Sequence, residues 1–103
     1  MARELGGVGT RVLFENDRVR VWEMRLEPGE SSPVHEHALD YVIVQLAGDR
    51  IAGAQEPDSR SHLAPYVERD VRQGWAVFVP KGGIERAVNV GRERYWEILV
   101  ELK

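Results

Sequence analysis

The hydrophobic positions of this chain fall in short runs, and almost none of them repeat with the spacing of a helix. The runs are rich in Val, Ile, Tyr and Trp and are separated by turn residues, which is the pattern of β-strands. We predict strands over residues 10–15, 19–27, 35–37, 41–46, 50–54, 64–69, 75–79, 84–90 and 94–102. Many short strands without helices indicate an all-β sandwich or barrel.

The pattern within the strands predicts which of them are covered. Residues 41–46 are apolar on both faces, so this strand is expected in the centre of a sheet, and residues 75–79 are expected to form a buried strand. Pro65 interrupts residues 64–69, and because proline lacks an N–H, this strand is expected at an edge. In two strands the side chains divide into two alternating sets, one on each face. In residues 19–27 the two sets are Trp22, Met24 and Leu26 on one face and Glu23, Arg25 and Glu27 on the other. In residues 94–102 they are Trp96, Ile98, Val100 and Leu102 on one face and Tyr95, Glu97, Leu99 and Glu101 on the other.

Length and composition limit the protein class. The 103 residues suffice for one domain, which we place at residues 10–103 behind a loose, glycine-rich arm at residues 1–9. The net charge is −3 and no basic block is present, which argues against nucleic acid as the main partner. The chain has no cysteine and no apolar run that would suit a signal peptide or a membrane span. We therefore expect a cytoplasmic protein without a membrane partner.

The candidate chemistry centres on His35 and His37. One residue separates them, so on a β-strand both side chains point to the same face and can bind one metal ion. The flanks favour a strand, because Pro28 and Gly29 form a turn ahead and a β-rich run follows. Two of three histidines can also reach this spacing by chance, and His62, in a polar loop, is expected to face solvent. The pair thus predicts a metal site on a sheet without establishing it.

Two longer stretches around these residues match the pattern of a known family. The first reads Gly29, five residues, His35-x-His37, three residues, Tyr41, six residues and Gly48; the second reads Gly74, five residues, Pro80-x-Gly82, two residues, Glu85, three residues and Asn89. They resemble the two sequence motifs of the cupin superfamily, and the resemblance covers roughly residues 19–102. Residues 40–44 and 97–103 also resemble small stand-alone bacterial cupins, some of which are named for a role in β-alanine degradation.

The resemblance implies a cupin-type jelly-roll β-barrel with a metal ion held inside, near the mouth. Cupins usually bind iron, manganese, nickel or zinc through two histidines and a glutamate of the first motif and a third histidine of the second. His35 and His37 match the histidine pair. This chain departs from the pattern twice, because Tyr41 stands in the glutamate position and Glu85 in the position of the third histidine.

These departures leave alternatives open. His35, His37 and Glu85 still supply two imidazoles and a carboxylate, which suit a divalent transition metal with open positions, provided that Glu85 faces inward. Tyr41 is a weaker candidate ligand, because an ordinary phenol pKa of about 10 disfavours the phenolate, and as a phenol it would donate a hydrogen bond across the pocket. Asp40 can turn inward at a bulge as a replacement ligand, or it can orient a histidine.

Further side chains are expected to line a substrate pocket beside the metal. Ile43 and Gln45 share a strand face with Tyr41, and a polar group inside a barrel needs a partner or a ligand. Trp22 is a further candidate for the pocket, although a tryptophan at such a position more often belongs to the core.

Two function classes remain open at this stage. The first is a small metal-dependent enzyme that acts on a small carboxylate or carbonyl compound, with dioxygenase- or isomerase-like chemistry. The second is a non-catalytic binding module or sensor with a degenerate metal site, because two of the four expected ligands are replaced. In both cases the expected partner is a small molecule. A domain of this size with apolar strands is also expected to form a homodimer, by sheet packing or by exchange of its N-terminal strand.

Overall fold

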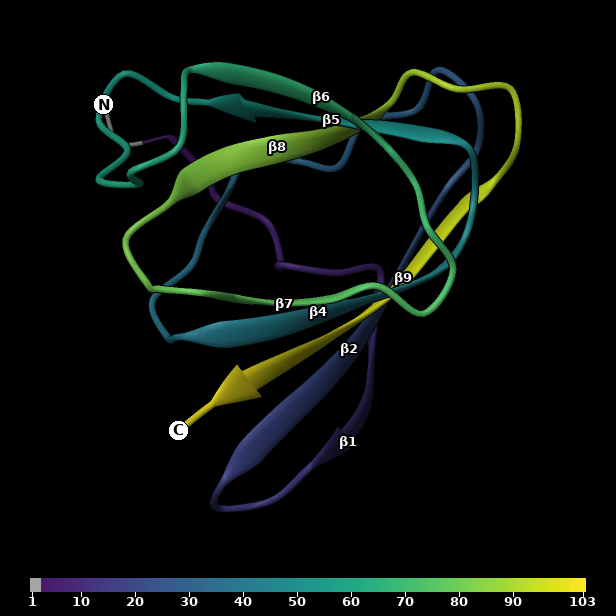
Figure 1. Ribbon diagram of the computed structural model, residues 1–103. Helices are drawn as coiled ribbons and strands as arrows, with labels where there is room; N and C mark the ends of the chain where they lie inside the picture. The colour runs from purple at the N-terminus through teal and green to yellow at the C-terminus, as the bar shows by residue number, and fades with distance from the viewer. Residues whose placement is uncertain (1–2) are drawn as a thin grey trace.

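The protein folds into two antiparallel β-sheets that face each other, as seen in a computed structural model that describes residues 3–103 (Figure 1). The five-stranded sheet has the order β1-β2-β9-β4-β7, and the four-stranded sheet has the order β3-β8-β5-β6. The strands are β1 (Arg11–Glu15), β2 (Val19–Leu26), β3 (His35–Glu36), β4 (Tyr41–Ala47), β5 (Arg50–Gln55), β6 (Tyr66–Asp70), β7 (Ala76–Val79), β8 (Ile84–Asn89) and β9 (Tyr95–Leu102). The predicted all-β class is confirmed. Residues 3–103 contain no helix long and apolar enough to cross a membrane.

The positions of three strands test the predictions from the apolar pattern. Strand β4 lies between β9 and β7, as its two apolar faces predict, and β6 lies at an edge of its sheet, as Pro65 predicts. The prediction of a buried strand at residues 75–79 is wrong. Strand β7 is the edge of the five-stranded sheet, and Phe78 on its outer face is 56% exposed.

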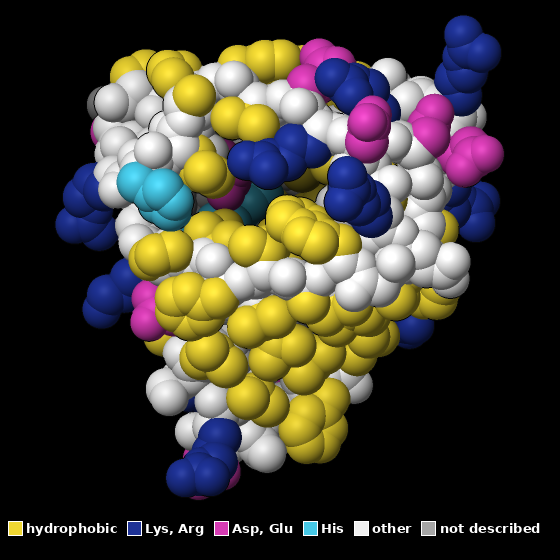
Figure 2. Space-filling model, viewed as in Figure 1, with side chains coloured by type: hydrophobic (Ala, Val, Ile, Leu, Met, Phe, Trp, Pro, Cys, Tyr) yellow, Lys and Arg dark blue, Asp and Glu magenta, His cyan; other side chains and the backbone are white. Residues whose placement is uncertain are grey.

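The apolar face of β9 points away from the interior. Its inward residues are Tyr95, Glu97, Leu99 and Glu101, all of them buried, and its outward residues are Trp96, Ile98, Val100 and Leu102. Cross-strand pairing lines up one apolar residue from each of the five strands on this outer face. The row consists of Phe14, Val21, Val100, Val42 and Phe78. We call this row and its neighbours Val44, Ile98 and Leu102 the outer apolar face; Figure 2 shows a broad hydrophobic surface over this sheet.

Two hydrophobic clusters fill the space between the sheets on either side of a cavity. The first contains Val8, Tyr41 and Leu99, with Trp22, Ile43 and Val79 packed against it; the second contains Met24, Leu26 and Tyr95, with Ile51, Val71 and Ala87 packed against it. The second cluster joins the two sheets, because Ile51 and Ala87 belong to the four-stranded sheet, whereas the first packs Val8 against the inner face of the five-stranded sheet. Burial of apolar surface of this kind is the main stabilising term of a sandwich.

The segment expected to be a loose arm is in part held against the sheets. Val8 is buried in the first hydrophobic cluster, and the Gly6 N–H donates to the carbonyl of Val34 at 2.8 Å. Residues 1 and 2 of the expected arm lie outside the described residues. Burial of Val8 anchors this segment, whereas Leu5 is 42% exposed; the polar, glycine-rich composition of the segment did not indicate this contact.

Candidate metal centre

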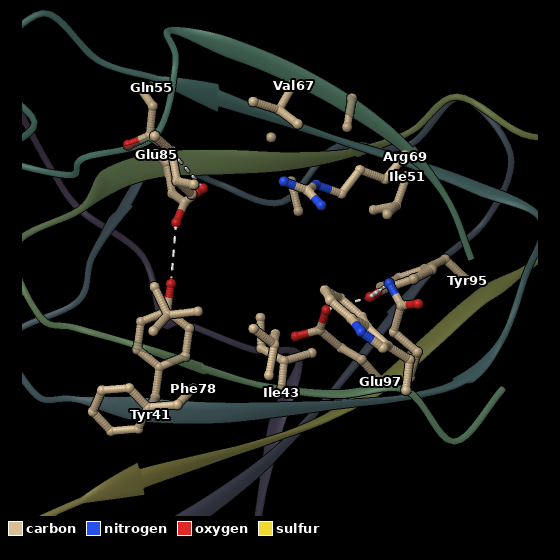
Figure 3. Close-up of a pocket in the computed structure, with 18 of the residues that line it drawn as sticks. Tyr41, Ile43, Ile51, Gln55, Val67, Arg69, Phe78, Glu85, Tyr95 and Glu97 are labelled. Atoms are coloured by element: carbon tan, nitrogen blue, oxygen red, sulfur yellow. Dashed lines mark hydrogen bonds between the residues drawn. The ribbon is translucent and has the colours of Figure 1, made fainter. Parts of the chain in front are cut away.

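A cavity of about 320 Å³ lies between the two sheets and has a polar group at each end. In Figure 3 Tyr41 and Glu85 lie at one end, Tyr95 and Glu97 lie at the other, and Ile43 and Val67 lie between them. The predicted pocket residues Tyr41, Ile43 and Gln45 all line this cavity. Strand alternation explains their shared direction, because residues two apart face the same side of a sheet.

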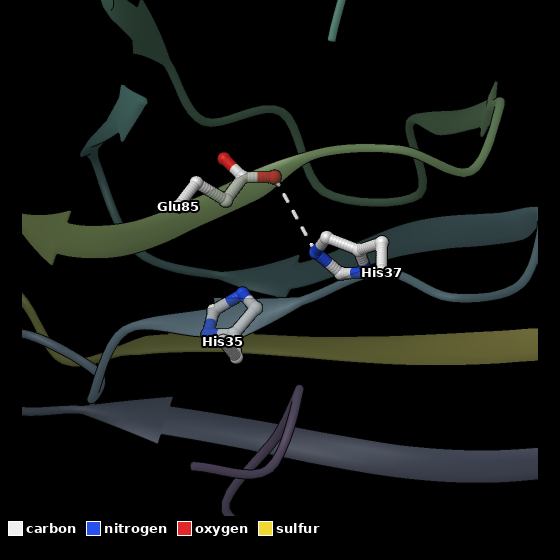
Figure 4. A group of neighbouring side chains, drawn as sticks. All are labelled: His35, His37 and Glu85. Atoms are coloured by element: carbon white, nitrogen blue, oxygen red, sulfur yellow. Dashed lines mark ion pairs between the residues drawn. The ribbon is translucent and has the colours of Figure 1, made fainter. Parts of the chain in front are cut away.

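His35, His37 and Glu85 converge at the first end of the cavity (Figure 4). One ligand atom from each of the three lies within 4.8 Å of the other two. His35 lies directly opposite Glu85 in the pairing of β3 with β8, which brings together residues from the two motifs of the sequence. The inward position of Glu85, left open by the sequence, is thus settled by the register.

Backbone hydrogen bonds hold His37 in place just beyond the end of β3. Its N–H donates to the Gly83 carbonyl at 2.8 Å, and its own carbonyl accepts from the Gly82 N–H at 2.9 Å. Gly82 has a φ of 118°, a backbone conformation that residues other than glycine rarely adopt. The turn before β8 therefore needs this glycine. Its hydrogen bonds to His37 extend the strand-like pairing of β3 with β8 to that residue.

The hydrogen bond of His35 leaves one ring nitrogen directed at the site. Its Nδ1 lies 2.9 Å from the Pro33 carbonyl oxygen, which can only accept, so Nδ1 carries the proton and Nε2 keeps a lone pair. Burial lowers the pKa of His35, and the neighbouring His37 lowers it further. A neutral imidazole with its second nitrogen bound to a carbonyl is the form in which histidine ligates metals.

Glu85 is the charged partner of the two histidines. Its Oε1 lies 3.3 Å from His37 Nε2, and its Oε2 accepts a hydrogen bond from Gln55 Nε2 at 3.0 Å. Burial by itself raises the pKa of Glu85, but the hydrogen bond and charge of His37, the charge of His35 and the Gln55 hydrogen bond lower the pKa overall. Glu85 is therefore a carboxylate at neutral pH, although it is largely buried.

The distance between two of these donor atoms, one on His37 and one on Glu85, is compatible with a shared small divalent cation. Two ligands about 2.1 Å from one ion, at an angle of about 90–109°, lie about 3.0–3.4 Å from each other. The distance from His37 Nε2 to Glu85 Oε1, 3.3 Å, falls within this interval. His37 Nδ1 is buried without a hydrogen-bond partner among residues 3–103, and its ring is instead positioned by stacking on Tyr41, with centroids 3.9 Å apart.

Tyr41 takes the donor role that the sequence left as an alternative to ligation. Its hydroxyl donates to Glu85 Oε1 at 3.4 Å. Burial and the charge of Glu85 raise the pKa of Tyr41, so that the phenol keeps its proton at neutral pH. A phenol in this state holds the carboxylate in position and presents its hydroxyl oxygen to the cavity as an acceptor.

Two of the predicted site residues lie elsewhere. Asp40 was expected to ligate the metal or to orient a histidine, but its Oδ1 accepts a hydrogen bond from the Lys81 backbone N–H at 2.9 Å and caps that turn. Trp22 was expected in the substrate pocket, but its ring packs in the first hydrophobic cluster and its Nε1 donates to Glu101 Oε1 at 2.6 Å, outside the lining of the cavity. His62 is exposed, as expected, at the rim of the cavity.

The second end of the cavity contains a buried carboxyl group that sequence reasoning did not single out. The Tyr95 hydroxyl donates to Glu97 Oε1 at 2.5 Å, and Gln45 Nε2 lies 3.4 Å from the Tyr95 oxygen. Burial raises the pKa of Glu97 to about 7; the hydrogen bond from Tyr95 lowers it and the charge of Glu85 raises it. The alternating side chains of β9 placed Glu97 on the same face as Tyr95, but the sequence did not indicate which face of β9 lies inside the barrel.

Comparisons with known proteins agree with this architecture. No family model matches the sequence, and no curated protein matches it either. Among solved structures, a cupin domain from Bordetella pertussis Tohama I is similar over 100% of this chain and 99% of its own, with a TM-score of 0.77 and 24% identity. A double-stranded β-helix domain protein from Klebsiella pneumoniae is similar over 97% of this chain and 81% of its own, with a TM-score of 0.68 and 19% identity.

The same fold also occurs within an enzyme. The DMSP lyase DddQ from Ruegeria pomeroyi DSS-3 is similar over 85% of this chain and 40% of its own, with a TM-score of 0.61 and 18% identity. Identities at this level establish a shared fold and leave the chemistry to the residues of the site. The expected cupin architecture is confirmed: the chain has the double-stranded β-helix fold of the cupin superfamily.

Proposed function

We propose that this cupin-fold protein binds one divalent transition metal ion through His35, His37 and Glu85 and acts as a metal-dependent enzyme on a small carboxylate or carbonyl compound. The observation that carries the proposal is the convergence of two buried imidazoles and a partly buried carboxylate within 4.8 Å, at the end of a cavity. Iron, manganese, nickel and zinc all suit a set of two histidines and one carboxylate.

A bound ion of this kind would supply Lewis acidity, or a binding position for dioxygen if it is redox-active. The protein residues then orient the substrate. Tyr41 keeps its phenol proton and donates it to Glu85, so its hydroxyl oxygen can accept a hydrogen bond from the substrate, while Gln55 holds the other oxygen of that carboxylate in place. The walls between the two ends are apolar, so they offer a carbon chain of the substrate a surface to pack against. In a chain without cysteine, this chemistry suits the cytoplasm, where we place the protein.

The test is the metal content of the purified, tag-free protein, measured by plasma mass spectrometry. We expect about one transition metal ion per chain in the wild type, and loss of that metal in the variant His35→Ala/His37→Ala. His62→Ala is the matched control, because this histidine is exposed and lies outside the converging group, and it should retain the metal. Equal metal content in the wild type and the double variant would refute the site. Absence of metal after loading with each ion would favour a non-catalytic binding module.

We further propose that two copies of the chain pair through the outer apolar face. The row of Phe14, Val21, Val100, Val42 and Phe78 gives this sheet an apolar stripe across its full width. Phe14 and Phe78, at the two ends of the row, are 55% and 56% exposed. A contiguous apolar surface of this kind is uncommon on a monomer, and flat sheets bury such surfaces well against a second copy.

A further inference from the structure

The strand register separates the two polar ends of the cavity. On the five-stranded sheet Tyr41 marks the metal end and Gln45, paired with Glu97, marks the other. The separation of four positions along β4 corresponds to about 13 Å of strand. On the facing sheet Gln55, paired with Glu85, lies at the metal end, and Ile51 lies four residues before it. Both sheets therefore divide the cavity in the same way.

Arg69 belongs to the end that contains Glu97. It pairs with Ile51 across β5 and β6, so it lies on the four-stranded sheet at the end away from Glu85. Alternation along β6 directs it inward, because its neighbours Glu68 and Asp70 face outward, where both bind Arg50 at 2.7 and 2.6 Å. Figure 3 shows the guanidinium group of Arg69 extending from β6 into the space between the sheets.

Among residues 3–103, Arg69 makes no side-chain hydrogen bond and no ion pair, whereas six other arginines pair with a carboxylate: Arg3, Arg11, Arg20, Arg25, Arg50 and Arg94. Five further arginines of the described residues, Arg18, Arg60, Arg72, Arg86 and Arg92, are exposed and equally unpaired, but they lie outside the lining of this cavity, to which Arg69 belongs. Arg69 is exposed, so water solvates its charge at the mouth of the cavity while its donors remain available. An arginine in this position is suited to a planar anion, because its N–H groups match the two oxygens of a carboxylate.

Glu97 adds a second polar group to the same end. One of its carboxyl oxygens is occupied by the Tyr95 hydroxyl, and Figure 3 shows the other directed toward the cavity. Gln45 holds this arrangement from β4: its Oε1 accepts from the Arg72 backbone N–H at 3.0 Å, and its Nε2 faces the Tyr95 oxygen. Because burial raises the pKa of Glu97 to about 7, the carboxyl keeps a proton in mildly acidic solution and can then donate it in a hydrogen bond.

The wall between the two ends is apolar. Ile43 and Val77 contribute to it from the five-stranded sheet, and Val67, paired with Gly53, contributes to it from the four-stranded sheet. A carbon chain is the group that such a wall would cover, since burial of apolar surface is favourable and no polar partner is available there for a ligand heteroatom.

We propose that the end of the cavity between Arg69 and Glu97 binds the carboxylate of an elongated aliphatic acid, whose carbon chain crosses the apolar middle of the cavity. Arg69 supplies the charge and the paired donors, and the protonated carboxyl of Glu97 supplies a further donor. The inference rests on the proposed function only for the opposite end of the ligand, where a second oxygen group would reach the metal centre. It narrows the substrate class to acids with a polar group at each end.

The test compares the binding of hexanoate with that of hexanamide, an uncharged analogue of equal length, by calorimetry at about pH 6. We expect wild-type protein to bind hexanoate at least about tenfold more tightly than hexanamide, as hydrogen bonds to a charged group predict. Arg69→Gln should abolish this preference. Arg72→Gln is the matched control and should keep it, because it removes a nearby surface charge outside the cavity lining while preserving the backbone N–H that Gln45 uses.

A second arm separates this site from the metal centre. The measurement is repeated on wild-type protein treated with a chelator and on the His35→Ala/His37→Ala variant. A preference for hexanoate that persists in both places the carboxylate at the Arg69 end, whatever the metal content of the protein. A preference that disappears with the metal, that survives Arg69→Gln, or that is absent from the wild type overturns the inference.

Discussion

Replacing Glu97 with glutamine is expected to change how the stability of this protein depends on pH. Glu97 is 5% exposed, and burial raises its pKa from an ordinary 4.5 to about 7, while Tyr95 lowers it and the charge of Glu85 raises it. The folded protein therefore binds this proton more tightly than the unfolded chain does. The stabilising contribution is complete below about pH 4.5 and is lost as pH rises through about 7, so the free energy of unfolding falls across this interval.

The size of the effect follows from the two pKa values. Each pKa unit corresponds to about 1.4 kcal/mol, so a change from 4.5 to about 7 amounts to about 3 kcal/mol of stability lost between acid and neutral pH. That is a large fraction of the roughly 5–15 kcal/mol that stabilises a typical domain. In Glu97→Gln the side chain is neutral at every pH, and its amide oxygen can still accept the Tyr95 hydrogen bond.

The assay is urea unfolding at a series of pH values from about 4 to about 8.5, with the variant and the wild type in the same buffers. The difference between the two stability curves removes the groups that titrate in both proteins. It should rise in favour of the variant by about 3 kcal/mol between about pH 4.5 and about pH 8. Glu15→Gln is the control: hydrogen bonds from Arg20 and Lys103 lower the pKa of Glu15 to about 2. Above about pH 6 this group is ionised in the folded and the unfolded chain, so there the curve should run parallel to the wild type. A parallel curve for Glu97→Gln would refute the reasoning.

Three further variants test the metal centre and the outer apolar face. Tyr41→Phe keeps the ring stacked on His37 and removes the hydroxyl contact with Glu85. We expect an unchanged metal-to-protein ratio and, in a competition titration, about tenfold weaker affinity for zinc. Loss of all metal would instead identify Tyr41 as a ligand. In Gly53→Ala the new Cβ would lie 3.3 Å from Glu85 Oε2 and displace the carboxylate, so zinc affinity should fall in the same titration; unchanged affinity would show that Glu85 is not held there. Phe78→Glu places a charge on the outer apolar face and should convert a dimer to a monomer in sedimentation at micromolar concentration, whereas a monomeric wild type would contradict the pairing.

The local sequence was sufficient for the strands and for the direction of single side chains within them. Turn residues and β-rich runs located each strand of the barrel, and the one-residue spacing placed His35 and His37 on the same side. These predictions are reliable because they depend on backbone geometry over a few residues, and the two-residue period of a strand does not change with its surroundings. Edge placement of β6 followed in the same way from Pro65.

The tertiary structure decided which faces meet. The pairing of His35 with Glu85 joins positions from the two motifs, and nothing near either residue encodes that register. The alternation of β9 divides its side chains into two sets, but the apolar set lies outside and the set with Glu97 and Glu101 lies inside. The usual assignment of apolar residues to the interior fails here because the barrel encloses a cavity with polar ends, and because the outer sheet face is itself apolar. Which side of a strand is inside depends on the other strands around it, and so Arg69 and Glu97 became visible only when both sheets were in place.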